Sequence, residues 1–138
     1  AYKVSSLVPM LSESVQSSSR AYEEAGIGPE DLDFAELPDN SSWHELVYME
    51  ALGFCRPGEA EHWLDEGATE LGGKFPINVS GGFASFGEAV AAQGLLQLHE
   101  IVRQLRGEAG PRQVEGAKVG LGHAYGAQGN AGTVILKR

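Results

Sequence analysis

The spacing of apolar and polar residues along this chain predicts helices alternating with short strands. The predicted helices lie at 12–25, 42–53, 61–65 and 86–106. The predicted strands lie at 32–37, 77–79, 116–122 and 131–136. The chain is 42% hydrophobic and 21% charged, which is typical of an α/β protein.

The longest helical pattern, 86–106, follows the glycine-rich turn Ser80-Gly81-Gly82. Its first half is small and apolar nearly all round, so we expect that half to be deeply buried, whereas Glu100 is expected to face outward from the second half. Glycines let the backbone approach a ligand closely, and a helix start offers unpaired N–H groups. A ligand or a catalytic group is therefore expected at this turn.

A second glycine-rich segment, 122–130, separates the last two predicted strands and is expected to form a loop. It contains His123 and Tyr125, two side chains that can exchange protons. The glycine content is higher than packing requires, so this loop is the second candidate for a functional site.

Length and charge limit the possible classes of protein. A chain of 138 residues is about the size of one domain, 1–138. A net charge of −9 without a basic stripe argues against nucleic acid as a partner. No apolar run approaches the roughly 20 residues of a membrane span.

The cysteine and histidine content argues against a metal site. Cys55 is the single cysteine, which excludes an internal disulfide and a cysteine-rich zinc site and fits a reducing, cytoplasmic location. His44, His62 and His99 do not have the spacing of metal ligands, and we expect them to be surface or packing residues.

Several segments share their order with one known family. They are Ala21 to Ile27, Asp33 to Leu37 with Glu45 to Gly53, Gly72 to Lys74, Asn78 to Gly82, Gln104 to Ala109 and Gln113 to Ala117. In these segments the chain resembles the C-terminal half of a thiolase-superfamily protein, nearest the sterol-carrier-protein type. The resemblance implies a βαβαβαββ half with a mixed sheet and with 86–106 as a buried central helix. It also implies a twin half that carries a nucleophilic cysteine, from which residues 1–20 would lead in.

The departures from the family pattern concern its catalytic residues. Thiolases have a histidine where this chain has Pro38, another where it has Glu88, and often a cysteine near the central helix or in the last glycine loop. Thiolytic Claisen chemistry needs an imidazole to activate a thiol, and an ionised Glu88 would repel a thioester oxyanion. We therefore expect no thiolase activity.

The chain looks closer to the lipid-transfer-protein-like aldolases of steroid side-chain catabolism. That resemblance implies retro-aldol cleavage of a bulky, steroid-type β-hydroxyacyl-CoA, with acyl-CoA as substrate and no cofactor. It also implies a homodimer and an OB-fold partner protein. The alternative is a thiolase-like subunit without catalytic activity, which binds acyl-CoA or acts as a scaffold.

The candidate catalytic residues are Tyr125, His123 and Glu88. Tyr125 would handle the proton of the substrate hydroxyl, with His123 orienting it and Glu88 at the mouth of the same site. The candidate substrate-binding residues are Gly81, Gly82, Gly126 and Asn40.

Each candidate also has a structural interpretation. Tyr125 could pack its ring on glycine backbone, and Glu88 could form a capping box with Ser85 at the helix start. Asp39 and Asn40 have the residue types that cap the helix predicted at 42–53.

Overall fold

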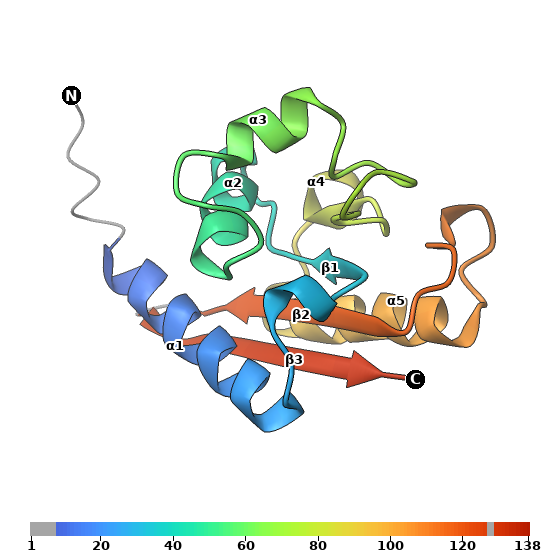
Figure 1. Ribbon diagram of the computed structural model, residues 1–138. Helices are drawn as coiled ribbons and strands as arrows, with labels where there is room; N and C mark the ends of the chain where they lie inside the picture. The colour runs from blue at the N-terminus through green and yellow to red at the C-terminus, as the bar shows by residue number, and fades with distance from the viewer. Residues whose placement is uncertain (1–7, 127–128) are drawn as a thin grey trace.

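The computed structural model describes residues 8–126 and 129–138, with side chains from residue 11 onward. The helical elements are α1 (Val8–Ala25), η2 (Pro29–Asp31), α2 (Ser42–Ala51), α3 (Ala60–Asp65), α4 (Gly82–Phe86), η3 (Val90–Ala92), α5 (Gln93–Arg106) and η4 (Gly110–Arg112). The strands are β1 (Phe34–Glu36), β2 (Val119–Tyr125) and β3 (Ala131–Lys137). The predicted α/β class is confirmed (Figure 1).

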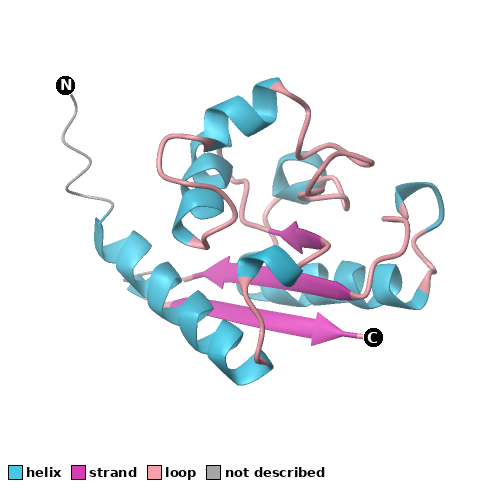
Figure 2. Ribbon diagram, viewed as in Figure 1, coloured by secondary structure: helices cyan, strands magenta, loops and turns pink. Residues whose placement is uncertain are grey.

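The three strands form one mixed sheet in the order β1-β2-β3 (Figure 2). β1 runs parallel to β2, with Phe34 opposite Gly120, and β2 runs antiparallel to β3, with Tyr125 opposite Ala131. On the other side of β1, Ala35 forms an isolated parallel bridge with Ile77, which is all that the described structure shows of the strand predicted at 77–79.

The sheet has a separate apolar cluster on each face. Phe34 packs with Ile101 and Leu105 of α5 on one face, and Ala35 and Leu121 pack with residues of α2 on the other. Neighbouring residues of a strand point to opposite faces, so β1 contributes to both clusters although it has only three residues. Its prediction as a half-buried strand is wrong, because both of its faces are covered.

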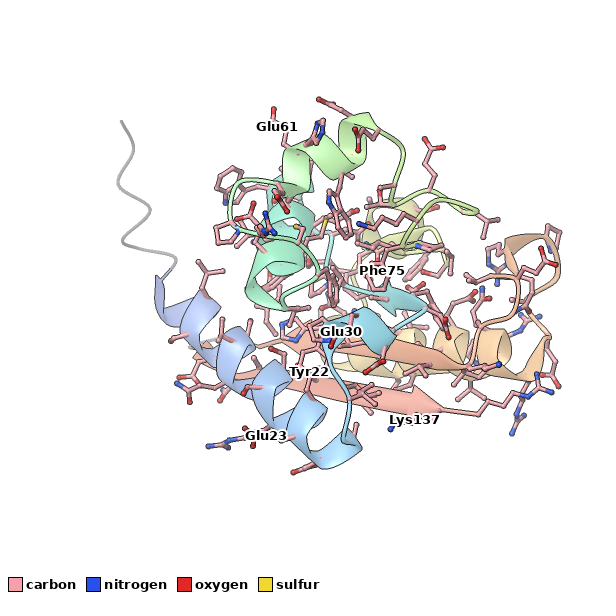
Figure 3. The ribbon with its side chains drawn as sticks, viewed as in Figure 1. Tyr22, Glu23, Glu30, Glu61, Phe75 and Lys137 are labelled. Atoms are coloured by element: carbon pink, nitrogen blue, oxygen red, sulfur yellow. The ribbon has the colours of Figure 1, made fainter. Side chains whose placement is uncertain are left out.

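Glycines in β2 allow α5 to lie close to the sheet. A Cβ at Gly120 would be 2.5 Å from Cζ of Phe34, and one at Gly122 would be 3.0 Å from Cδ1 of Ile101. Helix α1 covers the opposite face beside β3, where its Tyr22 hydroxyl donates to the Leu52 carbonyl at 3.0 Å (Figure 3).

The predicted helix 86–106 is a continuous α-helix only from Gln93 onward. α4 ends at Phe86, Gly87 has φ 88° and ψ 164°, and α5 begins only at Gln93. This backbone conformation at Gly87 cannot continue a helix. Burial of the first half is also wrong within this chain, because Val90 is 78% exposed and Leu95 is 67% exposed.

Glu100 does not face outward as predicted but is buried on α5. Its carboxylate accepts from the Arg112 guanidinium at 2.9 Å and from the Gln104 side-chain amide at 3.0 Å. These two partners replace water, which is the condition for burying a carboxylate.

The predicted loop 122–130 is largely strand. β2 continues through His123 to Tyr125, so only 126–130 connect it to β3, and residues 127–128 lie outside the described structure. The expectation that residues 1–20 lead in from another half falls partly outside it as well, since description begins at Val8, where α1 starts.

Candidate active site

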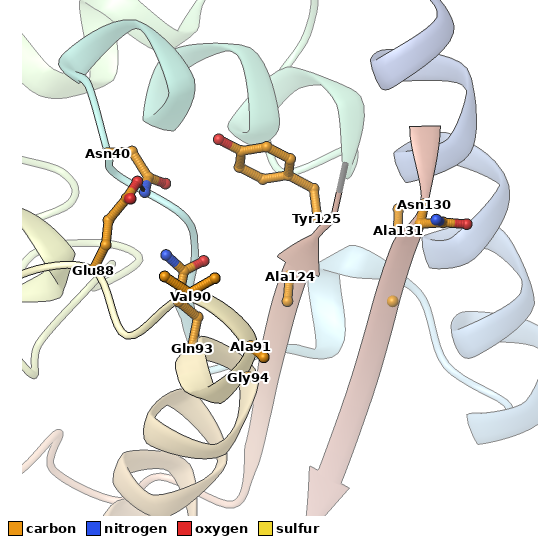
Figure 4. A pocket seen from close by; sticks show the side chains of 12 residues that line it. Asn40, Glu88, Val90, Ala91, Gln93, Gly94, Ala124, Tyr125, Asn130 and Ala131 are labelled. Carbon is orange, nitrogen blue, oxygen red and sulfur yellow. Dashed lines mark hydrogen bonds between the residues drawn. The ribbon is translucent and has the colours of Figure 1, made fainter. Parts of the chain in front are cut away.

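A cavity of about 680 Å³ lies where β2 ends, beside the start of α5 and the loop before α2. Four of the predicted site residues line it, namely Asn40, Glu88, Tyr125 and Gly126. In Figure 4 the Tyr125 hydroxyl points toward the side of the cavity where Asn40 and Glu88 lie. The structure therefore brings together residues that are up to 86 positions apart, since 126 − 40 = 86.

Tyr125 is the last residue of β2 and is half-buried. Its ring lies 5.4 Å from that of His44 and 5.7 Å from that of Tyr48, measured between centroids. Burial, and secondly the charge of Glu88, raise the pKa of Tyr125 above its usual value. The side chain is consequently a phenol at neutral pH, with a proton to donate.

Glu88 follows the bend at Gly87 and is exposed at the cavity. Its carboxylate accepts a hydrogen bond from the side-chain amide of Asn40. The alternative capping box with Ser85 is wrong, because Ser85 lies inside α4 and Glu88 is not in a helix. Asn40 Oδ1 is buried and makes no hydrogen bond within the described residues.

His123 is fully buried and does not line the cavity. Its Nδ1 lies 2.9 Å from the Thr133 hydroxyl and its Nε2 lies 3.0 Å from the Ser14 hydroxyl. Burial lowers the pKa of His123 to about 4, so the ring is neutral near pH 7. It contacts the ring of Tyr48 at 4.9 Å, and Tyr48 in turn contacts Tyr125. This placement allows His123 to support the tyrosines but not to reach a substrate in the cavity.

Gly81 and Gly82 lie outside the cavity lining. The Gly82 N–H donates to the Ser80 hydroxyl at 3.1 Å, and the Phe83 N–H donates to the Asp39 carboxylate at 2.6 Å. The N–H groups of this turn therefore have partners within the chain. The expectation that Asp39 caps the helix at 42–53 is also wrong, since Asp39 binds the start of α4 and Ser41 is the N-cap of α2.

Two residues that contact Tyr125 are not among the candidates from the sequence: His44, predicted to be a surface or packing residue, and Tyr48, for which the sequence made no prediction. The structure places both rings against Tyr125. Their spacing of four positions within the predicted helix 42–53 puts them on one helix face, and this signal could have identified the pair.

The described lining of the cavity contains neither cysteine nor histidine. Cys55 is buried elsewhere, and burial, with Glu50 and Glu59, raises the pKa of its thiol to about 11. Over 8–126 and 129–138, the structure brings together no group of three His, Cys, Asp or Glu side chains able to hold a metal ion. Within the same residues, no helix has both the length and the apolar character needed to cross a membrane.

Comparison with curated proteins gives several similar chains. Sterol carrier protein 2 of Rattus norvegicus is 47% identical over 91% of this chain and 23% of its own length. An acetyl-CoA acetyltransferase of Methanothermobacter thermautotrophicus is 37% identical over 94% of this chain and 34% of its own length. The chain therefore spans about a quarter to a third of these relatives.

Comparison with solved structures gives the same fold. The Ltp2-ChsH2(DUF35) aldolase matches with a TM-score of 0.79 and 31% identity, over 91% of this chain and 31% of that one. The family model described as "Thiolase C-terminal domain-like" matches residues 3–138. With its mixed sheet, its helices on both faces and this match, the chain belongs to the thiolase C-terminal domain-like family.

Proposed function

We propose that this chain is part of a retro-aldolase that cleaves a bulky, steroid-type β-hydroxyacyl-CoA. The observation that carries the proposal is the shared cavity of Tyr125 and Glu88, whose described lining offers a phenol and a carboxylate but no thiol or imidazole. Similarity to an aldolase of the same fold supports this choice. Retro-aldol cleavage needs proton transfer but no covalent thiol intermediate.

The chemistry assigned to the two residues follows from their protonation. The substrate loses its β-hydroxyl proton, the bond between Cα and Cβ breaks, and a carbonyl product and a thioester enolate form. Tyr125 carries its own proton at neutral pH, so its oxygen can accept the hydroxyl proton only while it gives its own proton away. The acceptor of that proton is the Glu88 carboxylate, toward whose side of the cavity the Tyr125 hydroxyl points (Figure 4). Glu88 then gives the proton it received to Cα of the enolate, which completes the acyl-CoA product. Tyr125 keeps the proton from the substrate hydroxyl and is again a phenol, and Glu88 is again a carboxylate, so no proton is gained or lost overall.

The proposed assembly extends beyond this chain. Its cavity is open, and the chain covers 31% of the similar aldolase, so we assign the remainder of the acyl-CoA site to other parts of the protein. The name of that aldolase joins Ltp2 to ChsH2(DUF35), which supports a partner protein here, proposed to have an OB fold. We further propose a homodimer, and a cytoplasmic location in which the free thiol of Cys55 stays reduced.

A second candidate function is acyl-CoA binding without catalysis. Relatives named sterol carrier protein 2 and, in Caenorhabditis elegans, non-specific lipid-transfer protein-like 2 favour it. The contact between Asn40 and Glu88 also favours it, because an amide that holds the carboxylate competes with proton transfer.

Tyr125→Phe in the assembled protein separates the two candidates. We expect carbon–carbon cleavage of a β-hydroxyacyl-CoA to fall by about 10²–10⁴-fold, the range for loss of a general acid or base. The matched control is Tyr22→Phe, which removes a hydroxyl bonded to the Leu52 carbonyl, and neither Tyr22 nor Leu52 lines the cavity.

Three outcomes count against the proposal. Unchanged cleavage by Tyr125→Phe would refute the proton-transfer role. Tight binding of acyl-CoA by the wild type without cleavage would establish the scaffold function instead. Thiolysis of a 3-ketoacyl-CoA would restore the thiolase activity that the residues argue against.

A further inference from the structure

The glycine-rich turn before α4 is held by side chains that follow β1. Glu36 accepts from the Ser80 N–H at 3.1 Å and from the Ser80 hydroxyl at 2.6 Å. Asp39 accepts from the Phe83 N–H at 2.6 Å and, more weakly, from the Ala84 N–H at 3.4 Å. One short stretch, 36–40, therefore holds the segment 80–88 at several points along its length.

The Asp39 carboxylate lies directly against the backbone of the turn. Asp39 is 8% exposed as a residue, and a Cβ at Gly82 would overlap its Oδ2. Gly82 also has φ 65°, a conformation that favours glycine. The carboxylate can approach the start of α4 this closely only because residue 82 has no side chain.

The helical elements on either side of Glu88 are too short to fix its position by themselves. α4 has five residues, Gly87 bends the chain, and the next element, η3, starts two residues after Glu88 and has three residues. The described contacts that hold this segment on the side of β1 are those of Glu36, Asp39 and Asn40.

We infer that Asp39 is a positioning residue, which fixes Glu88 opposite Tyr125 by holding the first N–H groups of α4. The catalytic meaning of this inference rests on the proposed function. Its structural content is that Asp39 sets how near the charge of Glu88 lies to the phenol of Tyr125.

Asp33 provides a matched control at the other end of β1. Its carboxylate accepts from the Lys118 N–H at 2.7 Å and from the Val119 N–H at 2.8 Å. It therefore makes the same type of contact with two consecutive N–H groups, but away from the cavity. Asp33→Asn reports the effect of losing such a contact on stability alone.

The experiment is an NMR titration of tyrosine labelled with ¹³C at Cζ, in the full protein with its partners, with the Tyr125 signal assigned by its loss in Tyr125→Phe. The side chains that face this phenol are Glu88, His44 and Tyr48. Glu88→Gln is expected to lower the pKa of Tyr125, because it removes a nearby negative charge.

Asp39→Asn is expected to lower the pKa of Tyr125 in the same direction, by letting Glu88 move away. In a Glu88→Gln background it is expected to have no further effect, whereas Asp33→Asn leaves the pKa of Tyr125 unchanged in either background. In turnover, Asp39→Asn is expected to lower kcat more than it raises KM.

Two results would overturn the inference. A wild-type pKa of Tyr125 in Asp39→Asn, with stability lost as in Asp33→Asn, would leave Asp39 as a helix cap only. A further fall in the Glu88→Gln background would show that the Asp39 charge acts on Tyr125 directly. The titration needs no substrate, so its outcome is independent of whether the protein cleaves a β-hydroxyacyl-CoA.

A milder variant keeps the test available if Asp39→Asn does not fold. Ser80→Ala removes the hydroxyl that joins Glu36 to the Gly82 N–H. Because Asp39 keeps its contacts with the Phe83 and Ala84 N–H groups in this variant, we expect the pKa of Tyr125 to stay close to the wild-type value. A fall as large as that in Glu88→Gln would show that Glu36 and Ser80, rather than Asp39, fix Glu88, and would contradict the inference.

Discussion

The protonation state of buried Glu36 can be tested through the dependence of the free energy of unfolding on pH. Glu36 is 2% exposed at the end of β1, and burial raises the pKa of its carboxyl group to about 7 despite hydrogen bonds from Ser80. Between pH 4.5 and pH 7 the folded protein therefore keeps a proton that the unfolded chain has lost. The contribution of Glu36 to stability is present below pH 4.5 and is lost as the pH rises to 7.

The size of this contribution follows from the shift. The pKa moves from 4.5 to about 7, and each pKa unit corresponds to about 1.4 kcal/mol, so the total is about 3 kcal/mol. His123 has the opposite effect, since its pKa falls from 6.5 to about 4 and its contribution is lost as the pH falls through that range. In the wild-type protein the pH dependences of these two contributions nearly cancel, because one falls as the other rises.

The variant Glu36→Gln removes one of these two opposing pH dependences of stability. Unfolding in urea, followed by tryptophan fluorescence at several pH values from 4.5 to 7.5, gives the free energy of unfolding for the wild type and the variant. We expect the difference, wild type minus variant, to rise by about 3 kcal/mol as the pH falls from 7 to 4.5. Other titrating groups affect both proteins and drop out of the difference.

A second variant, His123→Gln, checks the direction in which stability changes with pH. For His123→Gln the same difference is expected to fall as the pH is lowered through 6.5, because the wild type then loses the benefit of its neutral imidazole. A difference for Glu36→Gln that stays constant between pH 4.5 and 7 would refute the assignment of a neutral Glu36 in the folded protein.

Three further predictions concern packing, hydrogen bonding and reactivity. Gly120→Ala should lower the free energy of unfolding by about 1–3 kcal/mol, since its methyl group meets Phe34, and Gly132→Ala, with open space, should not; equal urea midpoints would contradict this. Thr133→Val leaves a ring nitrogen of buried His123 without its partner, at a cost of about 1–3 kcal/mol in the same assay, and a neutral result would disprove that bond. Cys55 should react with a disulfide reagent at pH 8 about 100-fold more slowly in folded than in urea-unfolded protein, because its pKa is about 11 rather than 9; equal rates would count against burial of the thiol.

Local patterns predicted most of the helices and strands, but not where the longest helix begins. Small apolar residues continue from Ala89 to Ala92 into the helical pattern, so the sequence predicted a helix over this stretch despite Gly87, where the backbone leaves the helical conformation. At the start of α4 the Phe83 N–H donates to the carboxylate of Asp39, which is 44 positions away. A contact between residues so far apart does not appear in the periodic pattern of apolar residues.

In the candidate site, too, some features could be predicted from the sequence and others depend on contacts between distant residues. The resemblance to a known family directed attention to Tyr125, Glu88 and Asn40, and the structure places all three on one cavity. Burial of His123 could not be predicted, because its partners Ser14 and Thr133 lie on α1 and β3. A hydroxyl is too common a group for its pairing with a distant imidazole to be visible in one sequence.

The order of pairing in the sheet has a consequence for how the cavity forms. β2 and β3 are joined by the short connection 126–130, and hairpins of this kind form within about 1–10 μs. The pairing of β1 with β2 joins Phe34 to Gly120 and must close a far longer stretch of chain, which is slow. Tyr125 is thus carried by the early unit, whereas Asn40 and Glu88 lie within the stretch that must close. We expect the cavity to be completed late in folding, so that partly folded chains carry the tyrosine without its carboxylate.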